Sequence, residues 1–442
     1  MTENRAILVG LQLPGTEDAE VDSSLQELKR LVETLGFEVV GILKQRRKGP
    51  NPGTVVGIGK VKEIAQWTGG TGEVPSFGEE DADEESDETG HSSPKAKASK
   101  VVFDHELTPN QLKNLVDATG AEVLDRTGVI VEIFHRHAKT REARLQVEIA
   151  RLNYLSPRLR VTGGGERQGG GIGAKGVGET AHELDRRRIR DRVAELQGEL
   201  EAIHADQENR RSRRRDQSRV ALVGYTNAGK SSLMRALTGS QVLVADKLFA
   251  TLDTTVRAMQ PEGFPRILVS DTVGFIKKLP HDLVASFRST LDEAGDASLL
   301  FYVVDASDET FRSQLEVTRT VIGEIDAGDI PTQLILNKVD CLDIAQVHLL
   351  AREFPDALQI STRNPEDIER VKAFLRAFFE RGMKQDDIVI PYDDRSGLLG
   401  EIRKHASVVK ETYDEKGVKL TLKTTPEEWA KIHKLQKTGK AP

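Results

Sequence analysis

The segment GYTNAGKS, residues 224–231, constrains the fold of this chain more than any other stretch. The apolar run VALV (220–223) before it is typical of a buried strand, and SSLMRALTG (231–239) after it is typical of a helix that ends at glycine. A glycine-rich turn between a strand and a helix lets backbone N–H groups and the positive helix end converge on a phosphate. The pattern therefore predicts a P-loop in an α/β domain. Its fixed positions are Gly224, Gly229, Lys230 and Ser231.

The polar side chains of this loop have chemical roles that follow from their positions. Lys230 should reach the β- and γ-phosphates, and the Ser231 hydroxyl should ligate Mg²⁺. A chance glycine-rich turn is the competing interpretation, and the flanking strand and helix patterns disfavour it. The residues between the two glycines should line the phosphates with their backbone groups; these are Tyr225, Thr226, Asn227 and Ala228.

A second motif stands at the end of the strand-like segment RILVSDTVGF (266–275). It has the form Asp-x-x-Gly, in which the aspartate can hold Mg²⁺ through water and the glycine N–H can sense the γ-phosphate. Alone this pattern is common, but its position downstream of a P-loop makes it informative. We predict that the nucleotide site includes Asp271, Thr272, Val273 and Gly274.

The segment TQLILNKVD (332–340) identifies the base, because its strand-like run ends in Asn337-Lys338-Val339-Asp340. An aspartate carboxylate can accept two hydrogen bonds from the N1–H and 2-amino groups of guanine, whereas adenine offers no such donor pair on that edge. The motif therefore predicts GTP and GDP as ligands. A further strand-like segment, DALQIST (356–362), should complete the base pocket with Ser361, Thr362 and Arg363.

A polar, threonine-rich loop, DKLFATLDTTVR (246–257), lies between the P-loop and the Asp-x-x-Gly motif. One threonine in this position should ligate Mg²⁺ only while the γ-phosphate is present. GTP would then order the loop, and hydrolysis would release it. The spacing alone does not choose among the threonines of the loop.

Composition limits the class of protein. The 442 residues are 38% hydrophobic and 30% charged, which is typical of roughly two to four globular domains. No apolar run approaches the ~20 residues that a membrane span needs. The N-terminal MTENRAILVG has no export-signal pattern, and the single Cys341 rules out an internal disulfide. We therefore expect a cytoplasmic protein.

The N-terminal region alternates strand-like and helix-like patterns, which favours a small parallel α/β domain. An interruption at 71–98 contains the acidic run GEEDADEESDE and should be a disordered loop. The alternating segments are 5–13, 24–36, 37–45, 101–107, 108–120 and 121–134.

Two long helices joined by a glycine-rich loop are predicted next. The first should extend from 140 to Pro157, and the loop covers 160–180. Because paired helices are usually joined by about two to eight residues, so long a loop favours a function at the tip of the hairpin. Residues 141–219 contain 18 Lys and Arg against 13 Asp and Glu, in a chain of net charge −7; a solvated helix face is the competing interpretation. The seam of the second helix comprises Ile189, Val193, Leu196, Leu200 and Ile203.

Together these motifs resemble the HflX family of translation-factor-type GTPases. The order P-loop, FATLD, DTVGF and NKVD fits that family, as do HELTPNQLKNL, LDRTGVIVEIFHRHAKTREARLQVEIARLNYL and GGGIGAKGVGETAHELDRRRIRDRV. The likeness covers residues 5–395 apart from the acidic insert. It implies that the switch motif is Phe249-Ala250-Thr251-Leu252-Asp253, with Thr251 as the Mg²⁺ ligand.

The resemblance also implies a partner. Members of the family bind the large ribosomal subunit, so the hairpin tip should reach ribosomal RNA near the catalytic centre of that subunit. It implies GTP-dependent splitting or rescue of stalled or idle ribosomes. Two alternatives stay open from the residues: a GTP-gated switch that binds a protein, and an RNA-remodelling protein that acts away from ribosomes. We expect a monomer with no membrane partner.

The residue after Asp-x-x-Gly is Phe275, where many GTPases have a glutamine that orients the attacking water. Asn227 lies two residues before Gly229. In GTPases with an apolar residue after Asp-x-x-Gly, such an asparagine can coordinate K⁺, and stabilisation of the loop turn is the equal alternative. In either case we expect slow hydrolysis by the isolated chain and acceleration by ribosomal particles, with Lys230, Thr251 and Gly274 as catalytic residues.

The predicted fold class is α/β. A P-loop GTPase domain should follow a small parallel α/β domain and an antiparallel helical hairpin, and a small α+β C-terminal domain should come last. Within that last domain, residues 387–432 suggest the order strand, helix, strand, helix. The expected boundaries are 1–139, 140–217, 218–383 and 384–442.

Overall fold

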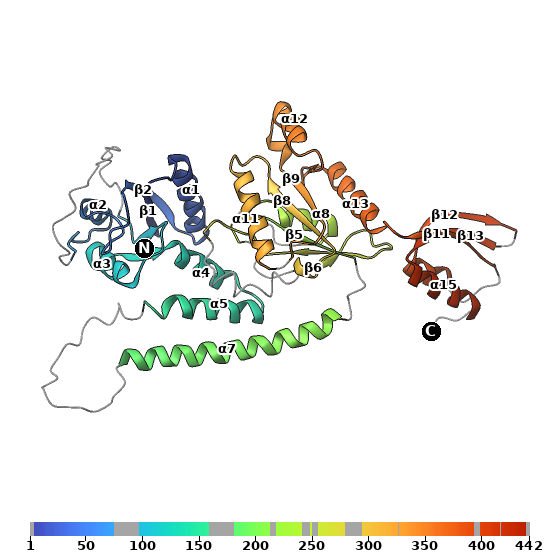
Figure 1. The fold of residues 1–442 in the computed structure, drawn as a ribbon, viewed down its shortest axis with the longest axis horizontal. Helices are drawn as coiled ribbons and strands as arrows, with labels where there is room; N and C mark the ends of the chain where they lie inside the picture. The colour runs from blue at the N-terminus through green and yellow to red at the C-terminus, as the bar shows by residue number, and fades with distance from the viewer. Residues whose placement is uncertain are drawn as a thin grey trace. The chain divides into compact units, whose positions relative to one another are not determined.

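The computed structural model forms two compact units (Figure 1). The first comprises 1–206 together with 246–252 and 277–287, and the second comprises 207–245, 253–276 and 288–442. The acidic run and the hairpin loop lie outside the described residues, so the expectations for them stay predictions. The residues described are 4–74, 97–158, 181–212, 218–240, 248–249, 255–278, 294–325, 327–392, 398–415 and 417–438.

The first unit begins with a parallel four-stranded sheet in the order β2-β1-β3-β4, as the alternating patterns predicted. Ile7, Val9 and Leu11 of the first strand pack in one core cluster with residues of two helices, α2 and α3. The strands are β1 (Arg5–Gln12), β2 (Glu38–Arg46), β3 (Lys100–Phe103) and β4 (Glu122–Asp125). The helices are α1 (Asp18–Thr34), α2 (Ile58–Thr68), α3 (Pro109–Thr119) and α4 (Arg126–His137).

The segment 121–134 differs from the simple alternation, because it divides into the short strand β4 and most of helix α4. The Asp125 side chain accepts a hydrogen bond from the Gly128 N–H at 2.8 Å, which caps the first turn of α4. The β-branched run that follows is therefore helical, although such residues also suit a strand. Capping and burial outweigh local propensity here.

The helical hairpin is present as an antiparallel pair, α5 (Arg141–Leu155) and α7 (Ala181–Ser212). Its core contains Leu145, Ile149 and Leu196, flanked by half-buried apolar residues of both helices. Three cross-helix ion pairs show the antiparallel register, since positions early in α5 meet positions late in α7. They join Arg141 to Glu199, Glu142 to His204, and Glu148 to Arg192.

The second unit contains a six-stranded mixed sheet in the order β10-β9-β8-β5-β7-β6, in which only β6 is antiparallel to its neighbour. Its core cluster contains apolar residues of strands β5, β7, β8 and β9 and of two helices, α8 and α13. The strands are β5 (Ser218–Val223), β6 (Thr255–Ala258), β7 (Ile267–Asp271), β8 (Leu299–Asp305), β9 (Thr332–Asn337) and β10 (Leu358–Gln359). The helices are α8 (Lys230–Thr238), α11 (Phe311–Glu324), α12 (Ile344–Glu353) and α13 (Pro365–Phe379), and η1 (Val339–Cys341) is a 3₁₀ turn.

The C-terminal region corrects one expectation, because it has the order strand, helix, strand, strand, helix. Its antiparallel sheet has the order β11-β13-β12 and packs on two helices around Ile402, Leu420 and Leu422. The missed hairpin turns at Gly417, whose N–H donates to Asp414 and whose φ of 146° favours glycine. The elements are β11 (Lys384–Ile390), α14 (Leu398–His405), β12 (Ser407–Asp414), β13 (Gly417–Thr424) and α15 (Pro426–Thr438).

These elements confirm the expected fold class: a parallel α/β sheet, a helical pair, a mixed P-loop sheet and an antiparallel α+β region. Across the described part of the chain, no helix combines the length and apolar character that crossing a membrane requires.

Candidate nucleotide-binding site

The P-loop connects the central strand β5 to helix α8, as the motif predicted. Gly229 has a φ of 95°, in the left-handed region that disfavours other residues. A Cβ at this position would lie 2.1 Å from the Asn337 Nδ2 atom, so the loop also needs glycine for close packing. Asn227 adopts a φ of 60° in the same turn. Two residues of this loop therefore have left-handed backbone conformations, at the place where its N–H groups are expected to converge on a phosphate.

Lys230 is buried at the start of α8. Its ammonium donates hydrogen bonds to the carbonyl oxygens of Gly224 and Tyr225 at 3.0 and 2.8 Å. Burial lowers the pKa of Lys230 to about 8, against the opposing influence of the Asp271 carboxylate. Phosphate oxygens would supply negative charge that stabilises the protonated form further. The lysine is thus held inside the loop, beside the expected position of the phosphates.

Ser231 and Asp271 bring two oxygen ligands together. The Ser231 hydroxyl donates to the Asp271 carboxylate at 2.6 Å, and Asp271 is fully buried. Within the described stretches, no group of three or more His, Cys, Asp or Glu side chains could form a metal site. Mg²⁺ needs no such cage, because it binds through one or two protein oxygens, waters and substrate phosphates. This hydroxyl–carboxylate pair fits that requirement.

The Asp-x-x-Gly turn is bonded to the P-loop on both sides. Thr272 donates its hydroxyl hydrogen to the Leu222 carbonyl at 2.8 Å. The Thr226 N–H donates to the Phe275 carbonyl at 2.8 Å, and the Phe275 N–H donates to the Gly224 carbonyl at 3.1 Å. The Phe275 backbone therefore forms hydrogen bonds with the P-loop. Its apolar side chain gave no indication of this contact.

Gly274 lies in close contact with the phosphate loop. A Cβ on this residue would lie 2.8 Å from the Thr226 Cα and 3.0 Å from the Lys230 Nζ. Real Cβ atoms essentially never come closer than about 3.0 Å to a heavy atom outside their own residue, so a larger side chain would displace the turn or the loop. The glycine is required by contact rather than by its φ angle.

The base motif is physically joined to the P-loop. The fully buried Asn337 donates from Nδ2 to the Ala228 carbonyl at 2.9 Å. Its Oδ1 accepts from the Thr362 N–H at 3.3 Å. One side chain therefore links the phosphate loop to both segments expected around the base. Asp340 lies beyond it and accepts from the Arg363 guanidinium at 3.4 Å.

Two carboxylates that sequence analysis missed support the base segments. The Lys338 ammonium, on a residue with a φ of 63°, pairs with Asp305 at 2.6 Å. Asp367 accepts from the Ser361 N–H at 2.8 Å. Asp305 is the last residue of β8 and pairs with Asn337, the last residue of β9. Asp305 could therefore have been found because both residues stand at the same end of adjacent parallel strands. Asp367 had no comparable signal.

The switch motif is described only in part. Phe249 is buried in the first unit with a φ of 56°, and its ring meets the Phe134 ring edge to face at 4.6 Å. Ala250, Thr251, Leu252 and Asp253 lie outside the described residues. The assignment of Thr251 as a Mg²⁺ ligand therefore stays a prediction, as do the chemical roles of the other motif residues.

Three family models match segments between residues 22 and 338. Residues 22–73 and 83–135 match the family described as GTP-binding GTPase N-terminal, and 137–214 match the GTP-binding GTPase middle region. Residues 219–338 match the family described as 50S ribosome-binding GTPase. The last of these matches contains the P-loop and the Asp-x-x-Gly motif and ends within the Asn-Lys-x-Asp motif.

Full-length relatives give the same result. GTPase HflX of Gluconacetobacter diazotrophicus is 56% identical over 433 residues, which is 95% of this chain and 95% of that protein. GTPase HflX of Escherichia coli is 37% identical over 437 residues, covering 97% of this chain and 96% of that protein. The protein of that name from Caldanaerobacter subterraneus is 37% identical over 431 residues, covering 96% and 92%. The chain belongs to the HflX family of GTPases.

Proposed function

We propose that this GTPase binds the large ribosomal subunit and uses GTP to split or rescue stalled or idle ribosomes. The observation that carries the nucleotide part is the Asn337 side chain, which bonds to the P-loop at Ala228 and to the base segment at Thr362. A pocket with joined phosphate and base halves suits a whole guanine nucleotide rather than an isolated phosphate.

We infer the following roles from the motifs, and the geometry of the described residues supports them. Lys230 neutralises the β- and γ-phosphates, and the Gly274 N–H senses the γ-phosphate. Ser231, Asp271 and, in the GTP state, Thr251 would hold Mg²⁺, which supplies charge stabilisation to the phosphates. Asp340 recognises the guanine edge, with Ser361, Thr362 and Arg363 beside the base.

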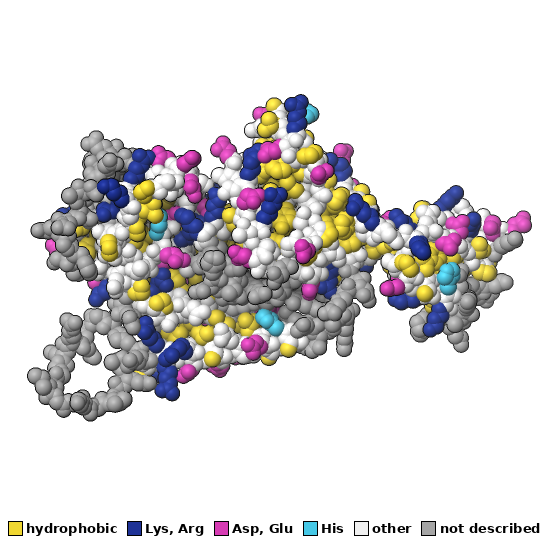
Figure 2. Space-filling view, viewed as in Figure 1, with side chains coloured by type: hydrophobic (Ala, Val, Ile, Leu, Met, Phe, Trp, Pro, Cys, Tyr) yellow, Lys and Arg dark blue, Asp and Glu magenta, His cyan; other side chains and the backbone are white. Residues whose placement is uncertain are grey.

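The ribosomal part is supported by the hairpin. Exposed or half-exposed cations gather near the start of α7, beside the residues that are not described (Figure 2). At the end of α5, Arg158 pairs with the buried Asp125 at 2.8 Å and lies 3.7 Å from the Tyr154 ring centre, which fixes the base of the loop. Contacts between the cations at the start of α7 and RNA phosphates would give binding that weakens steeply with salt. These cations at the start of α7 are Arg186, Arg187, Arg188 and Arg190.

Deletion of the loop residues 163–178 should abolish splitting of ribosomes and leave GTP binding intact. The reason is that the nucleotide contacts lie on β5, β7, β9 and their loops, whereas the loop is the proposed RNA contact. The measurement is sedimentation of 70S particles with the deletion variant and a GTP analogue.

A deletion of 75–90 in the acidic insert removes the same number of residues and provides a length-matched control that should split ribosomes normally. Normal splitting by the 163–178 deletion would show that the tip is only a linker. Salt-insensitive association with ribosomes would favour a protein contact and argue against RNA phosphates.

GTP turnover by the isolated chain should be slow, and large ribosomal subunits should accelerate it. Phe275 offers the water no donor or acceptor from its side chain, and its backbone is bonded to Thr226 and Gly224. A partner must therefore complete the site, for example by ordering the switch around Thr251. The measurement is phosphate release with and without subunits. Fast turnover by the isolated chain would contradict partner activation.

The same assay in K⁺ and in Na⁺ tests the role of Asn227. If Asn227 coordinates K⁺, native turnover should be faster in K⁺, and the Asn227→Ala variant should lose that difference. If it only stabilises the turn, the variant should be slowed equally in both salts. K⁺ indifference of the native protein removes the cation role and leaves partner activation untouched.

A further inference from the structure

The side chain of Thr226, in the middle of the P-loop, has a buried hydroxyl group without a protein partner. Thr226 is 7% exposed, and within the described residues its Oγ1 atom makes no hydrogen bond. The other threonines that are buried in this part of the chain each donate the hydroxyl hydrogen to a backbone carbonyl oxygen. They are Thr54, Thr119, Thr238, Thr272, Thr318 and Thr424.

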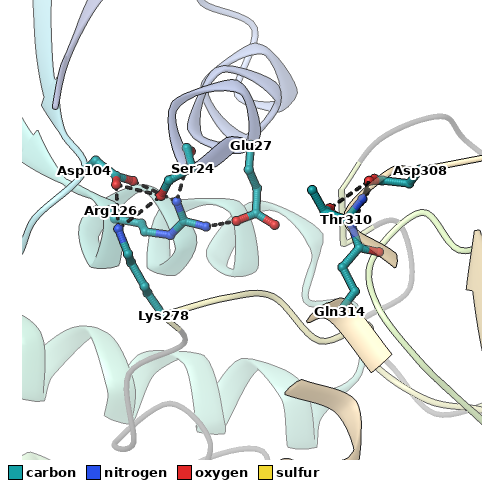
Figure 3. A network of polar contacts seen from close by, with 8 residues as sticks. All are labelled: Ser24, Glu27, Asp104, Arg126, Lys278, Asp308, Thr310 and Gln314. Atoms are coloured by element: carbon teal, nitrogen blue, oxygen red, sulfur yellow. Dashed lines mark hydrogen bonds and ion pairs between the residues drawn. The ribbon is translucent and has the colours of Figure 1, made fainter. Parts of the chain in front are cut away.

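A buried hydroxyl without a partner costs free energy, because folding removes its hydrogen bonds to water. A valine side chain has nearly the same shape and would fill the space without that cost. Figure 3 shows a threonine of the same unit that uses both capacities of its hydroxyl: Thr310 donates to Asp308 Oδ1 at 2.7 Å and accepts from Gln314 Nε2 at 3.1 Å. The Thr226 hydroxyl can bond in the same two ways to a ligand of the P-loop.

Thr226 lies beside the two groups that we propose to hold the γ-phosphate. A Cβ on Gly274 would lie 2.9 Å from the Thr226 Cγ2 atom and 3.0 Å from the Lys230 Nζ atom. The Thr226 methyl group and the Lys230 ammonium therefore approach the same point on the Asp-x-x-Gly turn. The hydroxyl branches from the same Cβ atom as this methyl group, so it lies at the edge of the volume between Lys230 and Gly274.

The backbone holds the Thr226 side chain in place. The Thr226 N–H donates to the Phe275 carbonyl at 2.8 Å, and Tyr225 forms a parallel bridge with Phe275. Threonine branches at Cβ and is stiff about its first side-chain torsion. All these residues belong to the second compact unit. The hydroxyl is therefore positioned before the reaction begins, which is what stabilisation of a transition state requires.

The attacking water needs a partner that the residue after Asp-x-x-Gly does not supply. The Phe275 side chain is apolar, and its backbone N–H and carbonyl both bond to the P-loop. A hydroxyl has one donor hydrogen and two acceptor lone pairs. The Thr226 hydroxyl can therefore accept a hydrogen bond from the water and donate one to a γ-phosphate oxygen at the same time.

We propose that Thr226 is a further catalytic residue of GTP hydrolysis: its hydroxyl holds the attacking water against the γ-phosphate. The water oxygen forms a bond to the γ-phosphorus, and the bond from that phosphorus to the bridging oxygen breaks, its electron pair leaving on GDP. One water proton passes to a γ-phosphate oxygen and the other stays on the attacking oxygen, which gives GDP and dihydrogen phosphate. Thr226 orients the water and stays neutral throughout.

The proposal rests on the proposed roles of Lys230 and Gly274 at the γ-phosphate, and it agrees with slow turnover by the isolated chain. A neutral hydroxyl orients the water but does not accept its proton, so a ribosomal partner can still accelerate the reaction. The contributions of Thr226 and of the partner should therefore multiply.

Thr226→Val in the full-length protein removes the hydroxyl and keeps the shape of the side chain. Single-turnover hydrolysis of GTP should slow by about 10- to 100-fold, because a hydrogen bond to a charged reacting group is lost. The loss should be equal with and without large ribosomal subunits. GDP affinity should stay native, and the unfolding temperature without nucleotide should not fall, since no hydrogen bond within the protein is removed.

Two further variants separate the hydroxyl from the shape of the side chain. Thr226→Ser keeps the hydroxyl and should retain most of the native rate. Thr318→Val is the matched control, because Thr318 is a buried threonine of α11 whose hydroxyl donates to the Gln314 carbonyl at 2.9 Å. The same substitution there should leave hydrolysis at the native rate.

A native rate in Thr226→Val would overturn the proposal. A Thr226→Ser variant as slow as Thr226→Val would also overturn it, and so would a loss of GDP affinity as large as the loss of rate, because the side chain would then be structural. Failure of large subunits to accelerate the native protein would instead contradict the proposed function. The comparison of native protein with Thr226→Val would still decide the role of the hydroxyl.

Discussion

Replacement of Asp340 by asparagine should weaken GTP binding about 100-fold and shift preference toward xanthosine nucleotides. In the proposed role the carboxylate would accept from two guanine donors, whereas an amide would present a donor that faces a guanine donor. Xanthine carries a carbonyl oxygen in place of the 2-amino group, so the amide can pair with it. The measurement is equilibrium binding of GTP, XTP and ATP to both proteins.

The control for this variant is Asp343→Asn, three residues downstream. Asp343 caps α12 by accepting from the Gln346 N–H, which an asparagine side chain can also do. It should leave nucleotide choice unchanged. The ion pair that Asp340 makes with Arg363 should matter little, because the Arg363 side chain is 85% exposed. Equal affinity of the native chain for ATP and GTP would contradict the assignment of the base.

Replacement of Gly274 by alanine should lower the rate of GTP hydrolysis by about 100-fold while GDP binding persists. The added methyl group would meet the Thr226 Cα at 2.8 Å, and backbone cannot rotate away as a side chain can. The turn would have to shift, and the Gly274 N–H would then no longer reach the proposed position of the γ-phosphate. Single-turnover hydrolysis with ribosomal subunits measures the effect.

Gly323→Ala is the matched substitution for this experiment. It lies in α11, and a Cβ there would meet nothing within 4 Å. Because alanine favours helix, this change should leave hydrolysis at the native rate. A native rate in Gly274→Ala would show that the turn does not take part in the reaction.

Local patterns predicted the P-loop, the strands that precede each nucleotide motif and four of the five seam residues of the second hairpin helix, Ile189 being the exception. They succeeded because glycine conformations, apolar runs and helical spacing are decided by residues close in sequence. The same patterns failed for 121–134, where one capping aspartate makes a β-branched run helical, and for the hairpin at Gly417 in the C-terminal sheet. In both places a side-chain hydrogen bond accompanies the conformation that the local pattern did not indicate.

Contacts between distant residues could not be predicted from one sequence. Lys278 and Asp104 are 174 positions apart, and nothing in either neighbourhood marks the other as a partner. Asp305 and Lys338 are 33 apart, and they could have been paired by noticing that both stand at the same end of adjacent parallel strands. The predictable part of the candidate site consists of its local motifs, and the rest depends on tertiary packing.

The hairpin of α5 and α7 has a small apolar core, and this determines how readily the two helices separate. Three buried side chains, Leu145, Ile149 and Leu196, join α5 to α7, and the ion pairs between these helices are largely exposed. Each such side chain contributes about 1.5–3 kcal/mol, far less than the many buried residues around β5 and β8 contribute. Amide hydrogens of α7 should therefore exchange with solvent through local opening, long before those of the central strands. Local opening of the hairpin should therefore leave the nucleotide site folded.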